Sequence, residues 1–275
     1  MNCLVVSDLH YTLKQFDWVS NRAPDFDVVV IAGDHLDISG HMDARAQIAV
    51  ILTYFKHLQA KTQVVVCSGN HDLDARNAVG EKYPKWISKV RDLGIPTDGD
   101  CLSVNETLFT ICPWWDGPYV REEIGAQLAR DSEKAKDRWI WVYHAPPDQS
   151  PTSWNGKQHY GDTALSGWIH QYQPDIVLTG HIHQSPFRQE GSWADLLGST
   201  WVFNPGRQTG PCPTHIVLNI EERAALWFSL AGDEIVHLNE PLRRPFHKIG
   251  QLPSWLRRFD QGSDQSPDHI PHSVD

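Results

Sequence analysis

The feature that most constrains the fold of this chain is a series of five polar clusters, each of which directly follows a short apolar run. The last cluster is Gly180-His181-Ile182-His183, which follows Ile176-Val177-Leu178. The four earlier clusters are Asp8-Leu9-His10, Gly33-Asp34, Gly69-Asn70-His71-Asp72 and His144. Short apolar runs predict buried strands, and an α/β sheet carries its chemistry at the ends of such strands. We therefore expect the clusters to converge at one edge of a sheet.

The N-terminal half has the periodicity of a parallel sheet. Apolar runs predict strands over residues 3–7, 27–32 and 64–67, and apolar residues at helical spacing predict a helix over residues 43–60. Strand, polar loop, helix and strand in this order are typical of a βαβ arrangement. Further helices are expected over residues 84–93, 120–137 and 163–172, and further strands over residues 101–104, 107–111, 139–143 and 176–178. These alternations predict the α/β fold class.

The region after residue 192 has a different pattern, with short strands separated by turns. Strands are expected over residues 194–197, 200–203, 215–220, 224–230 and 234–238, and we expect the last three to form an antiparallel meander in a second sheet. Because no repeat or linker divides the chain, residues 1–242 are predicted to form one domain, followed by a polar C-terminal extension over residues 243–275. The composition of residues 261–275 predicts disorder.

Composition and charge limit the classes of partner. The formal net charge of −10 argues against a general binder of nucleic-acid backbones, although a bound metal pair can still attract a small anionic substrate. We expect neither a signal peptide nor a membrane span, because the chain enters an apolar strand directly and has no run of ~20 apolar residues. The five cysteines include no Cys-x-x-Cys pair, which favours buried free thiols and a cytoplasmic location. The oligomeric state is left open.

Together, the clusters resemble the motif set of the calcineurin-like metallophosphoesterase superfamily, which runs D-x-H, G-D, G-N-H-[DE], H and G-H-x-H. All of these positions are filled between Asp8 and His183. The alternative is a set of solvated loops with incidental histidines, which accounts poorly for a complete set in the same order. The resemblance implies a four-layer α/β/β/α sandwich of two mixed β-sheets. It also implies a di-metal hydrolase of phosphoester bonds, most similar to the small bacterial members.

The resemblance further implies a role for each residue of the clusters. Seven side chains would hold two metal ions: Asp8, His10 and His183 the first, Asn70, His144 and His181 the second, with Asp34 bridging both. His71 would lie beside the leaving group, as a proton donor or an electrostatic stabiliser. The predicted catalytic residues are therefore Asp34 and His71, and no organic cofactor is expected.

The chemistry of phosphoester hydrolysis is consistent with these residue types. Nitrogen and oxygen ligands without thiolate favour transition metal ions such as Mn, Fe or Zn. A bridging carboxylate holds two ions ~3.5–4 Å apart, and a hydroxide that bridges them would attack phosphorus in line. Asn70 would add a neutral oxygen ligand, so the site would stay positive for an anionic substrate. A histidine with a pKa of ~6.5, such as His71, suits protonation of the leaving alkoxide.

The segment after Gly33-Asp34 narrows the reaction class. His35-Leu36-Asp37-Ile38-Ser39-Gly40 lacks the arginine of the Ser/Thr protein phosphatases in this superfamily, and Asp37 stands where purple acid phosphatases have a tyrosine. We therefore prefer a phosphodiesterase for a small or nucleotide-like substrate, with a phosphomonoesterase as the alternative. A catalytically silent binding or scaffold protein on the same fold is an alternative of another class, and the intact ligand set argues against it. A nuclease fits the ligands but not the acidic charge.

Three further segments lie outside the motifs. Trp114 and Trp115 would either stack on an aromatic group of the substrate or plug the core beneath their loop. Asn204-Pro205-Gly206-Arg207 resembles the Asn-Pro-Gly turn that often follows G-H-x-H in the small members, but we prefer a plain β-turn. We likewise prefer a solvated Arg207 to one that reaches a phosphate oxygen. The polar segment over residues 148–162 is too long for an ordinary connection, so we expect it to select the substrate, without assigning a role to any one of its residues.

Overall fold

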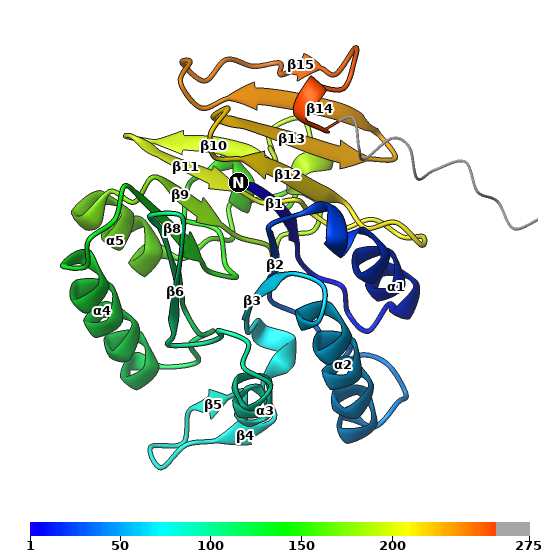
Figure 1. The fold of residues 1–275 in the computed structure, drawn as a ribbon. Helices are drawn as coiled ribbons and strands as arrows, with labels where there is room; N and C mark the ends of the chain where they lie inside the picture. Colours follow the sequence, from blue (N-terminus) through cyan, green and yellow to red (C-terminus); the bar gives the residue numbers. More distant parts are fainter. Residues whose placement is uncertain (257–275) are drawn as a thin grey trace, which may run out of the picture.

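The computed structural model describes residues 1–256, which form two large β-sheets packed face to face with helices on both outer faces (Figure 1). Three clusters of buried residues fill the spaces between the layers. The first packs α1 (Leu13–Arg22) and α2 (Ala44–Gln59) against one sheet, the second lies between the two sheets, and the third packs α4 (Pro118–Ser132) and α5 (Thr163–Tyr172) against the other sheet. The predicted four-layer α/β/β/α sandwich is therefore confirmed. The disorder predicted for residues 261–275 lies outside the described residues.

The first sheet has seven strands in the order β15-β14-β13-β12-β1-β2-β3. Its strands are β1 (Asn2–Val6), β2 (Val28–Ala32), β3 (Gln63–Cys67), β12 (His215–Asn219), β13 (Ala224–Ser229), β14 (Gly232–His237) and β15 (His247–Lys248). β1, β2 and β3 run parallel, because α1 and α2 return the chain between them. Every residue of β2 is buried, as its unbroken apolar run predicts.

The expectation that the C-terminal meander belongs to the second sheet is wrong. β12, β13 and β14 extend the first sheet, and β12 pairs antiparallel with β1, so that Cys3 lies opposite Leu218 and Val5 opposite Ile216. The side chains of β1 are fully buried from Cys3 to Val6, so the backbone groups along both of its edges need partners. The apolar pattern of β12 identifies a strand, but it does not specify which sheet edge that strand joins.

The second sheet has six strands in the order β10-β11-β9-β8-β7-β6. Its strands are β6 (Cys101–Val104), β7 (Thr107–Ile111), β8 (Arg138–Val142), β9 (Ile176–Leu178), β10 (Ala194–Leu197) and β11 (Thr200–Phe203). The inner strands run parallel, and β6 and β10 pair antiparallel at the two edges. The carboxyl ends of β8 and β9 therefore lie at the same edge of this sheet.

Two predicted helices differ from the structure. Residues 84–93 form a 3-10 turn (Lys85–Ile87) followed by α3 (Ser88–Asp92), and Asp74 Oδ1 accepts a hydrogen bond from Trp86 N in that first turn. α4 ends at Ser132 instead of residue 137. The ammonium group of Lys136 donates hydrogen bonds to the carbonyl oxygens of Asp131, Ser132 and Lys134, and these bonds close the helix early.

Three smaller segments lie at the margins of the sandwich. β4 (Ala75–Arg76) and β5 (Lys82–Tyr83) form a separate hairpin. Residues 148–162 contain a 3-10 turn (Pro151–Ser153), and isolated bridges join Pro147 to Asp162 and Trp154 to His159. In the C-terminal extension, β15 pairs with β14, and Leu256 is buried in the same core cluster as α1 and α2. The domain boundary at residue 242 stays a prediction.

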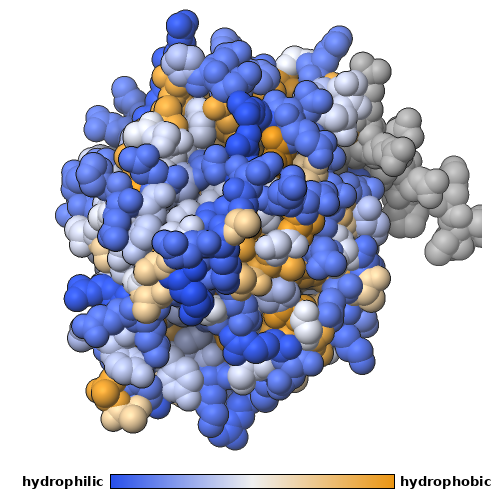
Figure 2. Space-filling model, turned by 60° about the vertical axis from the view of Figure 1, so that its left-hand side comes forward, coloured by the Kyte–Doolittle hydropathy of each residue, from blue (hydrophilic) through white to orange (hydrophobic). Residues whose placement is uncertain are grey.

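The surface and the thiols agree with the composition. The face of the molecule shown in Figure 2 is largely hydrophilic, and hydrophobic residues occupy small scattered areas of it. Within residues 1–256, no helix is both long and apolar enough to cross a membrane. All five cysteines lie among the described residues as free thiols, and Cys3, Cys67 and Cys112 are buried.

Candidate metal centre

The clusters predicted from the sequence meet at one end of the sandwich. Asp8, Asp34 and Asn70 follow the carboxyl ends of β1, β2 and β3 in the first sheet, and His144 and His181 follow those of β8 and β9 in the second. The ring centroids of His144 and His181 lie 5.3 Å apart. Asp8 makes hydrogen bonds to loops of both sheets: its N–H donates to the Gly33 carbonyl oxygen, and its carboxylate accepts from His181 N. Both sheets therefore contribute side chains to one site.

One group of possible metal ligands consists of Asp8, His10, Asp34 and His183, whose ligand atoms all lie within 4.8 Å of one another. His183 Nε2 lies 3.2 Å from Asp8 Oδ1 and 3.0 Å from His10 Nε2. His10 Nε2 lies 3.7 Å from Asp34 Oδ2. These are the three residues predicted to hold the first ion, together with the predicted bridge.

A second group consists of Asp34, His144 and His181, again with ligand atoms within 4.8 Å of one another. His144 Nε2 lies 3.2 Å from Asp34 Oδ2. Asp34 therefore belongs to both groups, which is the arrangement that a bridging carboxylate requires. Asn70, the remaining predicted ligand, has a buried side-chain oxygen with no hydrogen-bond partner among residues 1–256. The assignment of individual ligands to individual ions stays a prediction.

The backbone at the centre is held in an unusual conformation. Four of the candidate residues have positive φ angles: Asp8 (56°), His10 (41°), Asp34 (56°) and His181 (66°). The left-handed region costs an L-residue about 1–2 kcal/mol, and such strain gathers at functional sites. Hydrogen bonds offset the cost of this backbone strain: His181 N donates to both carboxylate oxygens of Asp8, and Asp8 N donates to the Gly33 carbonyl oxygen.

The glycines of the motifs are required by close approach. A side chain at Gly33 would collide with the ring of His144, and one at Gly69 would collide with the Asp34 carboxylate. At Gly180, a Cβ atom would lie 2.6 Å from Asp8 Oδ2. Glycine therefore lets each loop come near enough to place its neighbouring ligand in the shared site.

Asp72, a residue without a separate role in the predicted ligand set, holds two of the loops in register. Its carboxylate is fully buried and accepts hydrogen bonds from the backbone N–H groups of Asp34 (3.0 Å), His35 (3.0 Å), Leu36 (3.2 Å) and Gly69 (2.8 Å). Asp34 Oδ1 in turn accepts a hydrogen bond of 2.8 Å from His71 N. The loop after β2 is thus fixed to the loop after β3, and Asp34 Oδ2 is left to face His10 and His144.

His144 provides the test of whether a metal fits this site. Its Nδ1 donates to the Ala32 carbonyl oxygen at 2.7 Å, which leaves Nε2 as the atom that can bind either a proton or a metal ion. Nε2 is buried and has no hydrogen-bond partner within the described part of the chain. Because Nε2 faces the Asp34 carboxylate at 3.2 Å, either a proton or a metal cation must lie between the two atoms. Because the donors are carboxylates, imidazoles and an amide, without a thiolate, they fit a transition metal ion.

The electrostatics of the site also favour bound cations. Burial alone would raise the pKa of Asp8 and Asp34, but neighbouring histidines lower both, that of Asp34 to about 2 and that of Asp8 further. Burial lowers the pKa of His10 and His181 to about 4, so both are neutral ligands at pH 7. Burial also disfavours charge on His144, yet Asp34 and Asp8 raise its pKa to about 9. The carboxylates therefore attract positive charge to the place where the two groups meet.

His71, the predicted proton donor, lies at the margin of this cluster. Its ring meets the ring of His10 edge-on, with centroids 4.4 Å apart. Its Nδ1 is buried and makes no hydrogen bond to any residue of the described chain. The position is compatible with the predicted role, which stays a prediction.

The structure corrects the interpretation of the segment from Asn204 to Arg207 as a plain turn. Asn204 is fully buried, and its amide nitrogen donates to the carbonyl oxygens of Thr152 (3.0 Å) and Ile182 (3.1 Å). It therefore ties the loop that carries His181 and His183 to the loop over residues 148–162. Arg207 is half-buried instead of solvated, and its backbone N–H donates to the His183 carbonyl oxygen at 3.1 Å. The asparagine preceding Pro-Gly was the available signal.

Aromatic side chains surround His181. The ring of Trp114 lies 5.1 Å from it and that of Tyr160 5.9 Å, both between centroids. Trp115 turns away, and its indole N–H donates to Tyr143 Oη and Asp162 Oδ2, both at 2.7 Å. Trp115 is therefore part of the support beneath the site, whereas Trp114 and Tyr160 form its aromatic wall. Tyr160 comes from the loop over residues 148–162.

A two-sheet sandwich whose strand ends gather two groups of nitrogen and oxygen donors around one carboxylate defines a metal-dependent phosphoesterase. The sequence profile described as calcineurin-like phosphoesterase matches residues 1–185, so this chain belongs to the calcineurin-like phosphoesterase family. The sequence has no significant match among curated proteins.

The solved structure of TT1561 from Thermus thermophilus agrees with this fold. It is 13% identical with a TM-score of 0.55, over 86% of this chain and 98% of that one. The purple acid phosphatase PPD1 from yellow lupin is 14% identical with a TM-score of 0.49, over 90% of this chain and 52% of that one. The E. coli phosphoesterase Yfce is 14% identical with a TM-score of 0.44, over 87% of this chain and 100% of that one. At 13% identity, the likeness to TT1561 concerns the fold alone.

Proposed function

We propose that the centre holds two transition metal ions, of Mn, Fe or Zn, and that the enzyme hydrolyses a phosphodiester bond. The observation that supports the metal pair is the shared position of Asp34 Oδ2, which faces His10 at 3.7 Å and His144 at 3.2 Å. When bound, such a pair polarises the phosphoryl group and lowers the pKa of water.

In this proposal, the side chains of the centre divide the work. Asp8, His10 and His183 hold one ion, Asn70, His144 and His181 hold the other, and Asp34 binds both. His71 donates a proton to the oxygen that leaves phosphorus, which is the step at which an alkoxide needs one. The position of His71 supports this role, because its ring lies next to His10, at the margin of the group of candidate ligands.

The aromatic wall supports a substrate with an aromatic or nucleotide-like group. Tyr160 is 58% exposed although it packs against His181, so one of its faces is available for stacking. Stacking of a base on an aromatic side chain contributes about 1–3 kcal/mol. The partner we propose is therefore a small phosphodiester, and the net charge of −10 argues against a nucleic-acid polymer.

Two kinetic comparisons test the proposal. Rates with bis-p-nitrophenyl phosphate and p-nitrophenyl phosphate, measured with Mn²⁺, Fe²⁺ or Zn²⁺, should show the higher kcat/KM for the diester. A strong preference for the monoester would replace the proposal with a phosphomonoesterase. No bound metal, and no turnover with any of the three ions, would favour the catalytically silent scaffold.

The aromatic wall is tested by two substrates with the same leaving group. Thymidine 5′-(p-nitrophenyl phosphate) and methyl p-nitrophenyl phosphate differ only in the group that could stack. The variant Tyr160→Ala should raise KM for the thymidine ester and leave that for the methyl ester unchanged. Tyr119→Ala is the matched control, because Tyr119 is 50% exposed on α4. Equal effects on both esters would argue against stacking.

We further propose a cytoplasmic location. All five cysteines are free, and burial raises the pKa of the thiols of Cys3, Cys67 and Cys112, which keeps them unreactive. Fractionation of the source cells with an antibody against the protein tests this location.

A further inference from the structure

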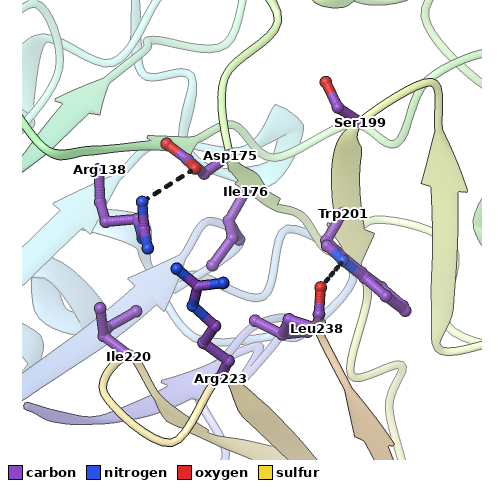
Figure 3. A pocket seen from close by; sticks show the side chains of 8 residues that line it. All are labelled: Arg138, Asp175, Ile176, Ser199, Trp201, Ile220, Arg223 and Leu238. Carbon is purple, nitrogen blue, oxygen red and sulfur yellow. Dashed lines mark hydrogen bonds and ion pairs between the residues drawn. The ribbon is translucent and has the colours of Figure 1, made fainter. Parts of the chain in front are cut away.

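A small cavity lies at the end of the sandwich opposite the candidate metal centre (Figure 3). Its volume is about 150 Å³, several times the roughly 30 Å³ of a water molecule in the liquid. Arg138 and Ile176, which line it, are the first residues of β8 and β9, and the far ends of the same strands lead to His144 and His181. Ile220 and Arg223, from the turn between β12 and β13 of the first sheet, also line the cavity. The cavity therefore lies where the two sheets meet.

The charges of this cavity are unbalanced. Two guanidinium groups, of Arg138 and Arg223, face one carboxylate, that of Asp175. Asp175 Oδ2 accepts a hydrogen bond of 2.8 Å from Trp139 N, and Oδ1 lies 3.8 Å from Arg138 Nη1. Asp175 is therefore held by the backbone and only weakly by the arginine. One positive charge is left without a counterpart in the cavity.

Arg223 carries that uncompensated charge. Its side chain points from the β12–β13 turn into the cavity, towards Arg138 and Ile176 (Figure 3). Within residues 1–256 its guanidinium makes no ion pair or hydrogen bond. Two acidic residues precede Arg223 in the turn: Glu221 is engaged with the ammonium group of Met1 at 2.6 Å, and the side chain of Glu222 is exposed and does not line the cavity.

The backbone fixes the direction of Arg223. Its φ angle is 50°, a left-handed conformation that costs an arginine about 1–2 kcal/mol. Its carbonyl oxygen accepts a hydrogen bond from Leu238 N, so the turn is attached to the end of β14. The side chain is therefore presented from a fixed position, and it does not depend on a flexible loop.

We propose that this cavity is a binding site for a phosphate-sized oxyanion, held between the guanidinium groups of Arg138 and Arg223. Arginine presents a planar fork of N–H donors that matches two oxygens of a phosphate group. The hydroxyl of Ser199, at the turn between β10 and β11, lines the same space and supplies a further donor. A bound oxyanion neutralises the excess charge and joins elements of both sheets at this end. The volume excludes a nucleotide, so the site is separate from the proposed substrate site.

Titration of the full-length, metal-loaded protein with inorganic phosphate tests the site, with chloride at matched ionic strength as the reference. Binding is followed by calorimetry and by the rise of Tm with phosphate concentration. Arg223→Ala should raise Kd at least tenfold, and Arg223→Lys, which keeps the charge but loses the fork, should lie between this variant and the wild type. Arg45→Ala, an exposed arginine on α2, is the control of equal charge change.

The variant Asp175→Asn should change the Kd for phosphate in the opposite direction from Arg223→Ala. The amide oxygen still accepts from Trp139 N, whereas the charge that competes with the anion is lost, so Kd for phosphate should fall. A merely structural role of these residues would not move the two Kd values in opposite directions. An unchanged Kd in Arg223→Ala, weaker binding in Asp175→Asn, or equal stabilisation by chloride would each overturn the proposal. Phosphate that binds at the metal centre is common to all variants and does not alter their differences.

Discussion

Single residues at the metal centre determine what it can bind. Asp34 divides its carboxylate between two tasks: Oδ1 is held by His71 N, and Oδ2 faces one histidine from each ligand group. His144 is oriented by the Ala32 carbonyl, so its free nitrogen points at the same oxygen. This division follows from contacts between loops far apart in sequence, and the motif letters alone do not contain it.

The variant Asp34→Asn should nearly abolish activity. The amide is neutral and a poor bridge, so both the spacing of the ions and the activation of water are lost. Loss of a side chain that only hydrogen-bonds to a metal ligand lowers activity roughly 10–100-fold, and we expect the loss of activity in Asp34→Asn to be greater. Steady-state kinetics and metal content by mass spectrometry measure it, with Asp92→Asn at an exposed position of α3 as control. A variant that keeps both ions and full activity would contradict the bridging role.

The variant His71→Ala should separate leaving groups by their need for a proton. General acid catalysis contributes roughly 10²–10⁴-fold, so an alkyl ester should lose about that factor. A p-nitrophenyl ester should change far less, because p-nitrophenolate leaves without a proton. The two kcat values, compared in one variant, provide the measurement. If both esters slow equally, His71 does not act as an acid.

Elements are held in place by contacts that sequence periodicity does not report. The strands and the main helices could be predicted from apolar spacing, because burial decides them locally. The sheet to which β12–β14 belong could not, because pairing of Cys3 with Leu218 is a contact between distant parts of the chain. For the same reason, the candidate ligands could be recognised from their motifs, whereas the hydrogen-bond partners of Asp72 and Asn204 could not.

The start of α4 depends on a distant acid. The carboxylate of Glu81, next to β5, accepts hydrogen bonds from the backbone N–H groups of Tyr119 (2.8 Å) and Val120 (3.0 Å). Glu81→Ala should therefore lower the free energy of unfolding by about 0.5–2 kcal/mol, the range measured for loss of a helix N-cap. Urea unfolding measures this loss, and Glu240→Ala, at an exposed position, is the control. Equal stability of the two variants would show that α4 needs no such cap.

The first residue of β12 should make stability depend on pH. Burial lowers the pKa of His215 to about 4, against ~6.5 in the unfolded chain. Between these values the unfolded state binds more protons, so the contribution is complete above pH ~6.5 and is lost as the pH falls to ~4. In His215→Asn, the drop in unfolding free energy from pH 7 to 4.5 should be about 2–3 kcal/mol smaller than in the wild type. The difference between the two proteins isolates His215 from other histidines, and parallel pH profiles would refute the assignment.

At the scale of the whole molecule, the candidate metal centre contains side chains from both sheets. Asp8, His10 and Asp34 come from the first sheet, whereas His144, His181 and His183 come from the second. Bound ions would therefore connect the sheets at one end in addition to the core between them. The fold class followed from the sequence because the motif spacing and the apolar strands agree, but the inter-sheet geometry depends on packing.

Removal of the metal should lower the stability of the entire fold. An ion that binds only the folded state adds about 2.7 kcal/mol when its free concentration is 100 times Kd. Treatment with EDTA should therefore lower Tm, and added Mn²⁺ or Zn²⁺ should restore it as the concentration rises. Calorimetry measures the shift, and Asp34→Asn should respond much less. If EDTA left the Tm of the wild type unchanged, the result would contradict a metal bridge between the sheets.

The pairing of β1 with β12 also determines the order in which the protein can assemble as it leaves the ribosome. β1 can pair with β2 once residues 28–32 have been synthesised, but its other edge stays open until residues 215–219 have followed. During that interval, an apolar strand is available to edges of other chains. Nascent chains stalled before residue 215 should therefore depend on chaperones far more than the completed polypeptide does.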